Sequence, residues 1–375
     1  MDERAGAVED LVTERAFWQG RRVLVTGHTG FKGAWLTLWL HALGAEVVGL
    51  ALAPVGRSLF VDAGVARDCV SCIADVRDPA EVQRVVDDAD PQIVFHLAAQ
   101  ALVRPSYAAA AATWSTNVMG TVHVLDALVR STATRAVVVV TSDKCYEHGA
   151  EARPFVEDDR LGGHDPYSSS KAAAELAVAS WRRSFLDARG IGVATARAGN
   201  VIGGGDWAVD RLIPDLALSA IEHRELQVRS PHATRPWQHV LDPLAGYLRL
   251  AERLHDEPAR YAGAWNFGPG AAASLPVHAI VRRFNAGLRE PIPFRFADDG
   301  ALHEARALSL STDKARDELG WRPRLSIDDA IRLTIDGYRP TIRGGDQRAV
   351  VLAQIAGYLQ GSASPASSAA SALAW

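Results

Sequence analysis

Two short segments of the chain carry the side chains with the clearest chemistry. Residues 141–144, Thr-Ser-Asp-Lys, end a run of four valines, and Tyr167 lies four positions before Lys171. Side chains four apart are neighbours on one face of a helix. A lysine ammonium beside a phenol favours the phenolate and lowers its pKa from about 10. Such a phenol is a base that accepts the proton of an alcohol or sugar hydroxyl as a hydride leaves.

Asp143 and Lys144 place a second acid–base pair near this phenol. One alternative is that they only cap the end of a strand and face solvent. In a doubly wound sheet, however, the carboxyl ends of the strands line the ligand site, so we favour the functional interpretation. The hydroxyl of Thr141 or Ser142 could polarise the same substrate oxygen. A simple dehydrogenase needs only the tyrosine and lysine, whereas an enzyme that also expels water needs both sets.

The elements that must position these residues alternate between strands and helices from position 22 to 198. Short β-branched runs predict buried strands at 23–25, 46–48, 93–95, 137–140 and 191–194. Helices are predicted between them at 33–43, 79–87, 114–129 and 166–185. This alternation predicts an α/β fold of Rossmann type, in which a doubly wound parallel sheet carries helices on both faces.

The alternation breaks down beyond position 200, which predicts a second domain. We expect the dinucleotide-binding domain to span 19–200, with a return segment near 236–268. A smaller, partly interleaved C-terminal α/β domain for the substrate would take 201–235 and 269–345. The tails at 1–18 and 361–375 are expected to be flexible, because the last stretch is rich in Ser and Ala.

A glycine-rich loop marks the expected dinucleotide site. Gly27, Gly30 and Gly33 directly follow the first predicted strand and open a helix. Glycine allows the tight turn and lets backbone N–H groups approach a pyrophosphate at the helix N-terminus. Such spacing also occurs in ordinary turns, but the strand–turn–helix context strongly favours a dinucleotide.

Signals for the rest of the dinucleotide are less clear. The second strand ends at 50–53 without an acidic residue that could bind a ribose 2′-hydroxyl. Arg57 could instead meet a 2′-phosphate, or be a solvated loop arginine. Asp75 is a candidate for the adenine amino group, whereas we interpret Asp78 as a helix N-cap. We interpret His96 as a buried histidine with satisfied hydrogen bonds.

Composition excludes several classes of function. The 375 residues have a formal net charge of -4, so nucleic acid is not an expected partner. The three cysteines do not form a disulfide framework and fit a reducing cytoplasm. Cys69 and Cys72 lack the further ligands that a metal site needs. The N-terminus lacks the apolar stretch of a signal peptide, and no run is long enough to span a membrane.

Longer segments resemble a known family. Residues 27–33, 141–146 and 165–171 resemble the extended short-chain dehydrogenase/reductase family of nucleotide-sugar epimerases and dehydratases, and within it the dehydratases that act on CDP-glucose. The resemblance covers roughly positions 19–345. It extends to the segments at 100–107, 115–121, 197–207, 210–215, 235–240 and 265–269.

The resemblance implies a reaction and its partners. Tyr167 would deprotonate the glucose 4-hydroxyl while C4 passes hydride to tightly bound NAD. Water would then be eliminated across C5–C6 and hydride returned to C6, giving CDP-4-keto-6-deoxyglucose. Asp143 would be the acid and Lys144 its elimination partner, as a base or as an ammonium that stabilises the enolate. A homodimer or homotetramer, built through the helices near 114–129 and 166–185, is also implied; the same apolar faces could equally pack on the sheet.

The resemblance also assigns binding residues by motif. Besides the three glycines, Tyr167 and Lys171, it assigns to the cofactor Thr29, Phe31, Lys32, Asp75, Val76, Leu97, Ala98, Ala99, Asn117 and Thr141. It assigns to the substrate Gln100, Arg104, Asn200, Trp207, Arg211, Arg235 and His239. Ser142 joins the catalytic group. Each of these arginines is also compatible with a surface salt bridge, and the Arg-Pro-Trp-Gln-His setting makes Arg235 the best candidate for the pyrophosphate.

Two other functions stay open at this point. A 4-epimerase or a decarboxylase of a nucleotide sugar would use the tyrosine and lysine without the Asp143–Lys144 pair. A dinucleotide-binding protein that has lost catalysis would need neither, although intact Tyr167 and Lys171 argue against it.

Overall fold

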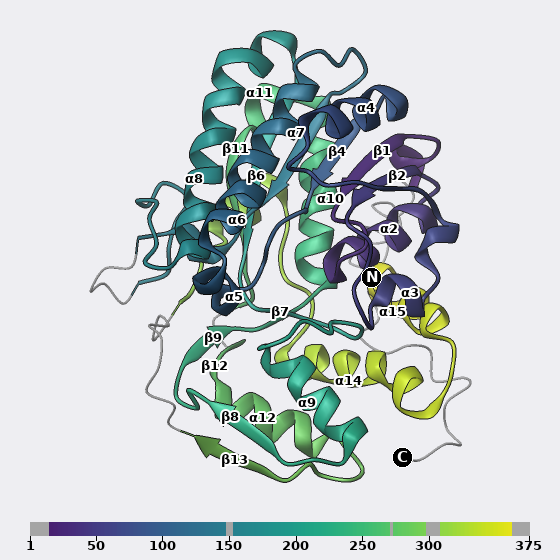
Figure 1. Ribbon diagram of the computed structural model, residues 1–375, viewed down its shortest axis with the longest axis vertical. Coiled ribbons are helices and arrows are strands. Elements are labelled where there is room, and N and C mark those ends of the chain that lie inside the picture. Colours follow the sequence, from purple (N-terminus) through teal and green to yellow (C-terminus); the bar gives the residue numbers. More distant parts are fainter. Residues whose placement is uncertain (1–14, 148–152, 271–272, 298–307, 362–375) are drawn as a thin grey trace, which may run out of the picture.

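A seven-stranded parallel sheet forms the centre of the protein (Figure 1). The computed structural model describes residues 15–147, 153–270, 273–297 and 308–361. Neighbouring strands follow the order β11-β6-β5-β4-β1-β2-β3, and every pair is parallel. Their bounds are β1 Arg22–Thr26, β2 Glu46–Ala51, β3 Cys69–Ile73, β4 Ile93–His96, β5 Ala136–Val140, β6 Gly192–Ala198 and β11 Gly263–Phe267. The predicted Rossmann-type sheet is confirmed, and its order reverses between β1 and β4.

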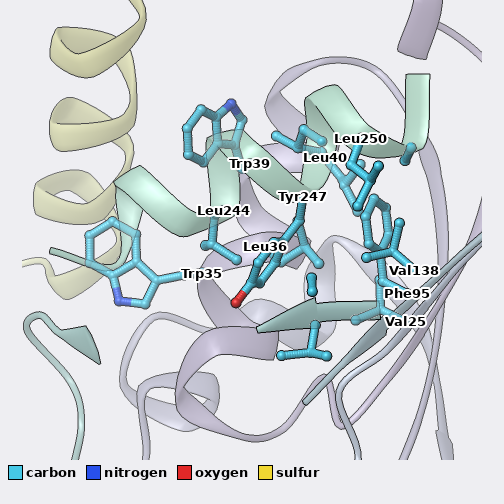
Figure 2. Close-up of a cluster of buried hydrophobic side chains, with 14 of the residues drawn as sticks. Val25, Trp35, Leu36, Trp39, Leu40, Phe95, Val138, Leu244, Tyr247 and Leu250 are labelled. Atoms are coloured by element: carbon cyan, nitrogen blue, oxygen red, sulfur yellow. The ribbon is translucent and has the colours of Figure 1, made fainter. Parts of the chain in front are cut away.

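Helices cover both faces of this sheet. One face packs on α2 (Phe31–Ala42), α10 (Leu241–Asp256) and α15 (Gln347–Leu359). The other packs on α4 (Pro79–Ala89), α7 (Gly120–Leu128) and α8 (Pro166–Trp181). Strands β4, β5 and β6 are buried at every position, which explains their continuous apolar sequences. Figure 2 shows the hydrophobic core on the face covered by α2 and α10, where Trp35 and Trp39 of α2 lie beside Leu244 and Tyr247 of α10.

Two of the predicted helices contain a wider turn. The stretch predicted at 114–129 consists of α6 (Ala110–Trp114), the π-helical turn η2 (Ser115–Met119) and α7. Similarly, α8 continues into the π-helical turn η4 (Arg182–Leu186). Such turns often accompany functional sites, and η2 contains the predicted cofactor residue Asn117.

A smaller lobe lies at the carboxyl edge of the sheet (Figure 1). It has a hydrophobic core of its own, to which α9, α12 and α14 contribute. Its elements are β7 Val201–Ile202, α9 Leu212–Glu222, β8 Leu226–Arg229, β9 Thr234–Pro236, β10 Gln238–His239, β12 Ser274–Pro276, α12 Val277–Ala286, β13 Phe294–Ala297 and α14 Ile327–Arg343. Shorter elements are α3 Leu59–Asp62, η1 Val65–Arg67, α5 Val103–Ala108, η3 Asp143–Cys145, η5 Asp187–Arg189, α11 Pro258–Tyr261 and α13 Asp313–Leu319.

The start of the described chain differs from the prediction. Residues 15–18, expected to belong to a flexible tail, are instead packed on the domain. Trp18 is fully buried, and its indole Nε1 donates a hydrogen bond of 2.8 Å to Glu252 of α10. The other tail positions, 1–14 and 362–375, lie outside the described residues. No described helix is long and apolar enough to cross a membrane.

Candidate active site

The glycine loop forms a cradle at the N-terminus of α2. Gly27 has a φ of +77°, and a Cβ there would lie 2.7 Å from the backbone nitrogen of Ala98. A Cβ on Gly33 would lie 2.1 Å from the carbonyl oxygen of Gly27. The helix begins after Gly30, which offers no side-chain cap, so the first N–H groups of α2 stay available to an anion. These features fit the pyrophosphate of a dinucleotide.

Replacement of Gly33 by Ala should therefore abolish dinucleotide binding. The added methyl group overlaps the Gly27 carbonyl and forces the loop open, because both contacting atoms belong to the backbone. We expect the purified variant to contain less than about a tenth of the wild-type NAD, measured after protein denaturation. The matched control is Gly20→Ala, at a position with open space around it. Gly20 has a φ of +70°, so this control also carries backbone strain. Full NAD content in the Gly33 variant would contradict this role of the loop.

The strand ends around the loop are tied together by hydrogen bonds. Thr26 Oγ1 accepts from the backbone nitrogens of Leu97 and Ala98, each at 3.1 Å. Thr29 donates to the carbonyl oxygen of Leu52 at 2.9 Å, so its hydroxyl fixes the loop to the end of β2. His28 is fully buried, and burial lowers its pKa to about 4, which keeps the imidazole neutral near pH 7.

Three predictions about polar residues near this loop can be compared with the structure. Asp78 caps α4 by accepting from two backbone nitrogens, as predicted. His96 is a satisfied buried histidine, with ring nitrogens 2.7 and 3.0 Å from threonine hydroxyls. Arg57 is an exposed loop residue, which agrees with the alternative of a solvated arginine, and its guanidinium also lies over the ring of Trp207 at 4.9 Å. Asp75 pairs with Arg77 at 2.6 Å, and its contact with adenine stays a prediction.

The end of β5 presents a buried carboxyl group. Ser142 caps the short helix η3 by accepting from the nitrogen of Lys144, and its hydroxyl donates to Asp143 Oδ1 at 3.1 Å. Asp143 is 3% exposed, and its Oδ2 has no hydrogen-bond partner among the described residues. Burial raises the pKa of this carboxyl group, while the Lys144 ammonium opposes the shift. The site therefore holds a carboxyl group that keeps its proton to higher pH than a free aspartate.

Tyr167 and Lys171 lie on α8, as predicted, but their electrostatics differ from the prediction. Burial raises the pKa of Tyr167 to about 12, and a hydrogen bond with Ser142 only partly opposes this. Lys171 Nζ donates to the carbonyl oxygen of Val140 at 3.2 Å. Burial lowers the pKa of Lys171 to about 8. The prediction that Lys171 lowers the phenol pKa is wrong for this structure, because desolvation of the phenol dominates.

A buried ion pair below these residues was missed by the sequence reasoning. Arg197 of β6 and Glu175 of α8 are each 4% exposed and lie 2.8 Å apart. The same carboxylate accepts hydrogen bonds from Thr141 and Thr195. The Thr141 hydroxyl is therefore engaged inside the protein, and the Ser142 hydroxyl donates to Asp143. Glu175 lies four residues after Lys171, and this spacing was the signal available in the sequence.

Asn117 and Gln100 hold each other in place. Asn117 Oδ1 accepts from the backbone nitrogen of Gln100 at 2.8 Å, and its Nδ2 donates to Ser170 of α8 at 2.9 Å. The Gln100 side chain donates to the carbonyl oxygen of Leu102 and to Thr113. Both amides, predicted to contact ligands, thus position the loop after β4 against α8.

Two of the predicted substrate residues, Arg235 and Arg211, act on the charges of Asp143 and Tyr167. Arg235 is buried, and its charge favours the Asp143 carboxylate. Arg211 pairs with Asp206 at 3.2 Å and also donates to the carbonyl oxygen of Ala101. Asp206 belongs to the loop at 203–207, and this loop packs on α14. His239 is fully buried, and its Nε2 is unpaired among the described residues. Asn200 lies between β6 and β7, and Arg104 lies on α5.

Lys32 joins the catalytic cluster and not only the cofactor loop. It is the second residue of α2, and Arg211, Lys171, Asp143 and Asp206 all act on its charge. Burial lowers its pKa to about 7, so near neutral pH this amine changes charge readily. Its position links the glycine loop to Asp143, which the motif alone did not reveal.

Known proteins share this arrangement. A model of the NAD dependent epimerase/dehydratase family matches residues 23–268. A CDP-glucose 4,6-dehydratase of Salmonella typhimurium is 43% identical over 352 residues, which cover 92% of this chain and 98% of that protein. A probable dTDP-glucose 4,6-dehydratase of Sinorhizobium fredii is 28% identical over 337 residues, covering 84% of this chain and 92% of that protein.

Solved structures show the same fold. A dTDP-glucose 4,6-dehydratase from Streptomyces venezuelae, with NAD and TYD bound, has a TM-score of 0.73 at 25% identity and covers 85% of this chain and 97% of its own. A UDP-glucose 4-epimerase from Stenotrophomonas maltophila has a TM-score of 0.75 at 22% identity, covering 87% and 100%. The family match spans the glycine loop, the end of β5 and the Tyr167–Lys171 helix. The family resemblance drawn from the sequence is therefore confirmed, and the chain belongs to the NAD-dependent epimerase/dehydratase family.

Proposed function

We propose that this enzyme is a CDP-glucose 4,6-dehydratase that forms CDP-4-keto-6-deoxyglucose and water. The observation that carries the proposal is the buried Asp143, which lies next to Lys144 and within electrostatic reach of Tyr167. Hydride transfer alone requires no such acid. The Salmonella typhimurium relative bears this activity in its name. NAD, when bound, accepts the hydride from C4 of the sugar and returns it to C6.

The first proton is removed by Tyr167. Its phenol lies near Ser142, whose hydroxyl orients the 4-hydroxyl group of glucose between the two. The proton passes from this sugar hydroxyl to the phenolate oxygen as C4 is oxidised. Burial keeps the free phenol protonated near pH 7, and the hydrogen bond with Ser142 and the charge of Arg211 are the groups that favour its phenolate form. Lys171 is held by the carbonyl oxygen of Val140.

The elimination uses Asp143 and Lys144. A ketone at C4 acidifies the C5 proton, which Lys144 takes up as the elimination base. The protonated carboxyl group of Asp143 gives its proton to the departing 6-oxygen as the C6–O bond breaks. A double bond between C5 and C6 remains, and water leaves.

Arginines bind the nucleotide diphosphate in this proposal. Guanidinium groups form paired hydrogen bonds with phosphate oxygens. Arg235 and Arg211 lie on segments that border Asp143 and the 203–207 loop, and Arg104 lies on α5 next to them. Trp207, which lies under the guanidinium of Arg57 and packs edge-on against Tyr338, closes the nucleotide side. We also assign Asn200 and His239 to the substrate site. We assign Asp75, Val76 and Ala99 to the cofactor site.

The experiment that tests the function is a substrate comparison. The purified enzyme is incubated with CDP-, dTDP-, UDP- and GDP-glucose, and the 4-keto-6-deoxy product is detected by its absorbance in alkali. We expect product from CDP-glucose at a kcat/KM at least about tenfold above the others, a difference of about 1.4 kcal/mol. No product from any of the four would refute the proposal.

We also propose that the enzyme is a homodimer or homotetramer in the cytoplasm. The three cysteines are free, as expected in a reducing compartment. Helices α5, α6 and α8 and turns η2 and η4 form one group of adjoining elements that exposes apolar side chains, namely Tyr107, Trp114, Met119, Leu176 and Phe185. Such a patch is typical of a protein–protein interface. The domain division at 200, with the return near 236–268, likewise stays a proposal.

Replacement of Leu176 by Arg should separate the subunits. Leu176 is 62% exposed on α8, and an arginine there would place two charges in a symmetric interface. We expect light scattering to give a multiple of 40.3 kDa for the wild type and a single chain for the variant. Val61→Arg is the matched control, because Val61 is 58% exposed on α3, outside this patch. A monomeric wild type would contradict the interface.

A further inference from the structure

Tyr247 of α10 carries a buried hydroxyl group that has no role in the reaction steps described above. The side chain is 0% exposed, and its hydroxyl has no hydrogen-bond partner among the described residues. Its ring packs edge-on against Phe267 at 5.5 Å. Figure 2 shows the ring beside Leu36 and Leu244, with the hydroxyl directed away from Phe95. A phenylalanine would fill this core equally well without a buried, unpaired hydroxyl group.

The hydroxyl lies near the catalytic acid. Helix α10 packs on β5, the strand that ends just before Asp143. Both Asp143 and Tyr167 act electrostatically on the Tyr247 phenol, whose pKa is raised first by burial and then by these two groups. Tyr167 approaches Asp143 from α8 on one face of the sheet, and Tyr247 approaches from α10 on the other.

Asp143 has an oxygen atom that matches this hydroxyl group. Its Oδ1 accepts from Ser142, whereas Oδ2 is buried and unpaired among the described residues. Oδ2 faces the backbone of Gly199, where a Cβ would lie only 2.6 Å away. A hydroxyl donor and a carboxylate acceptor, both buried and both unpaired at the same centre, are complementary.

We propose that Tyr247 is a positioning residue for the elimination, and that its hydroxyl donates a hydrogen bond to Asp143 Oδ2 when substrate is bound. With Oδ2 held in this way, Oδ1 carries the proton and points it at the departing 6-oxygen of the sugar. This inference rests on the proposed dehydratase function. It adds a second direction of support to Asp143, whose side chain hydrogen-bonds only with Ser142 among the described residues.

Burial raises the pKa of Asp143, and other charged groups around it lower this pKa. These are the charges of Lys144 on the same turn, Arg235 on β9 and Lys32 on α2, with Tyr167 and Cys145 nearby. A hydrogen bond donated by Tyr247 also favours the carboxylate. Its removal therefore raises the Asp143 pKa further, and the acid form needed for elimination persists to higher pH.

Tyr247→Phe tests the proposal, because it removes only the hydroxyl. We expect an unchanged or higher Tm, since an unpaired buried group is lost. We also expect kcat for CDP-glucose to fall about tenfold with KM unchanged. The alkaline limb of the kcat–pH profile should move to higher pH. Reduced-nicotinamide absorbance should last longer in a single turnover, because C4 oxidation is intact and elimination is slow.

The matched control is Tyr358→Phe. Tyr358 of α15 donates a 2.9 Å hydrogen bond to Asp242 of α10, the helix that also carries Tyr247. This variant should lose stability yet keep wild-type kcat and pH profile. A Tyr247→Phe enzyme with wild-type kcat and an unmoved pH profile would overturn the inference while leaving the dehydratase intact. A wild type inactive on CDP-glucose would instead refute the proposed function.

Discussion

Replacement of Tyr167 by Phe should lower kcat on CDP-glucose by about a thousandfold. The variant keeps the ring, which is 7% exposed, and loses only the oxygen that takes the proton of the 4-hydroxyl group. Because C4 oxidation is the first step, no reduced-nicotinamide absorbance should appear on mixing with substrate. The measurement is stopped-flow absorbance together with steady-state product formation.

Folding and cofactor content serve as the controls for this variant. The hydroxyl of Tyr167 contacts Ser142, so its loss should change Tm by only a few degrees. NAD content should match that of the wild type, because the glycine loop is untouched. Turnover within fivefold of the wild-type value would exclude Tyr167 as the base. A catalytically silent dinucleotide-binding protein would instead show no turnover in the wild type or in the variant.

Replacement of Asp143 by Asn should abolish dehydration while leaving C4 oxidation in place. Asparagine has nearly the same shape but no carboxyl proton to give to the 6-oxygen, and we expect product formation to fall by about 100-fold or more. Reduced-nicotinamide absorbance should rise after CDP-glucose is added and then persist. An unaffected turnover would point to a 4-epimerase or decarboxylase, which needs no acid at this position.

The pH dependence of the wild type should report the same carboxyl group. Burial raises the pKa of Asp143, so the folded protein holds the acid form at a pH where a free aspartate is ionised. The acid form is the active one, so kcat should fall as pH rises through this raised pKa. The residual rate of the Asn variant should lack this limb.

Much of the fold and half of the site could be predicted from local sequence. Continuous apolar runs predicted strands such as β5 and β6, because a parallel sheet buries both faces. The glycine spacing predicted the loop at 27–33, where close backbone contacts exclude a side chain. These features depend on neighbours in sequence, so a local pattern is sufficient.

The features that the sequence did not reveal depend on distant contacts. The phenol of Tyr167 is desolvated by segments from both lobes, and spacing to Lys171 says nothing about that burial. The Glu175–Arg197 pair joins a helix and a strand that lie 22 positions apart. Tyr247 resembles any core tyrosine until the positions of α10 and β5 are known.

The sheet cannot be completed during translation until its last strand, β11, has been synthesised. β11 pairs with β6 along its whole length, yet residues 199–262 lie between them in the chain and contain β7 to β10 of the small lobe together with helices α10 and α11. A ribosome must therefore release some 60 further residues before the edge of β6 is covered. During that interval the unpaired backbone edge of β6 is exposed, which is the kind of surface on which nascent chains associate. We expect this enzyme to depend on chaperones during synthesis, and fragments that end near position 200 to aggregate.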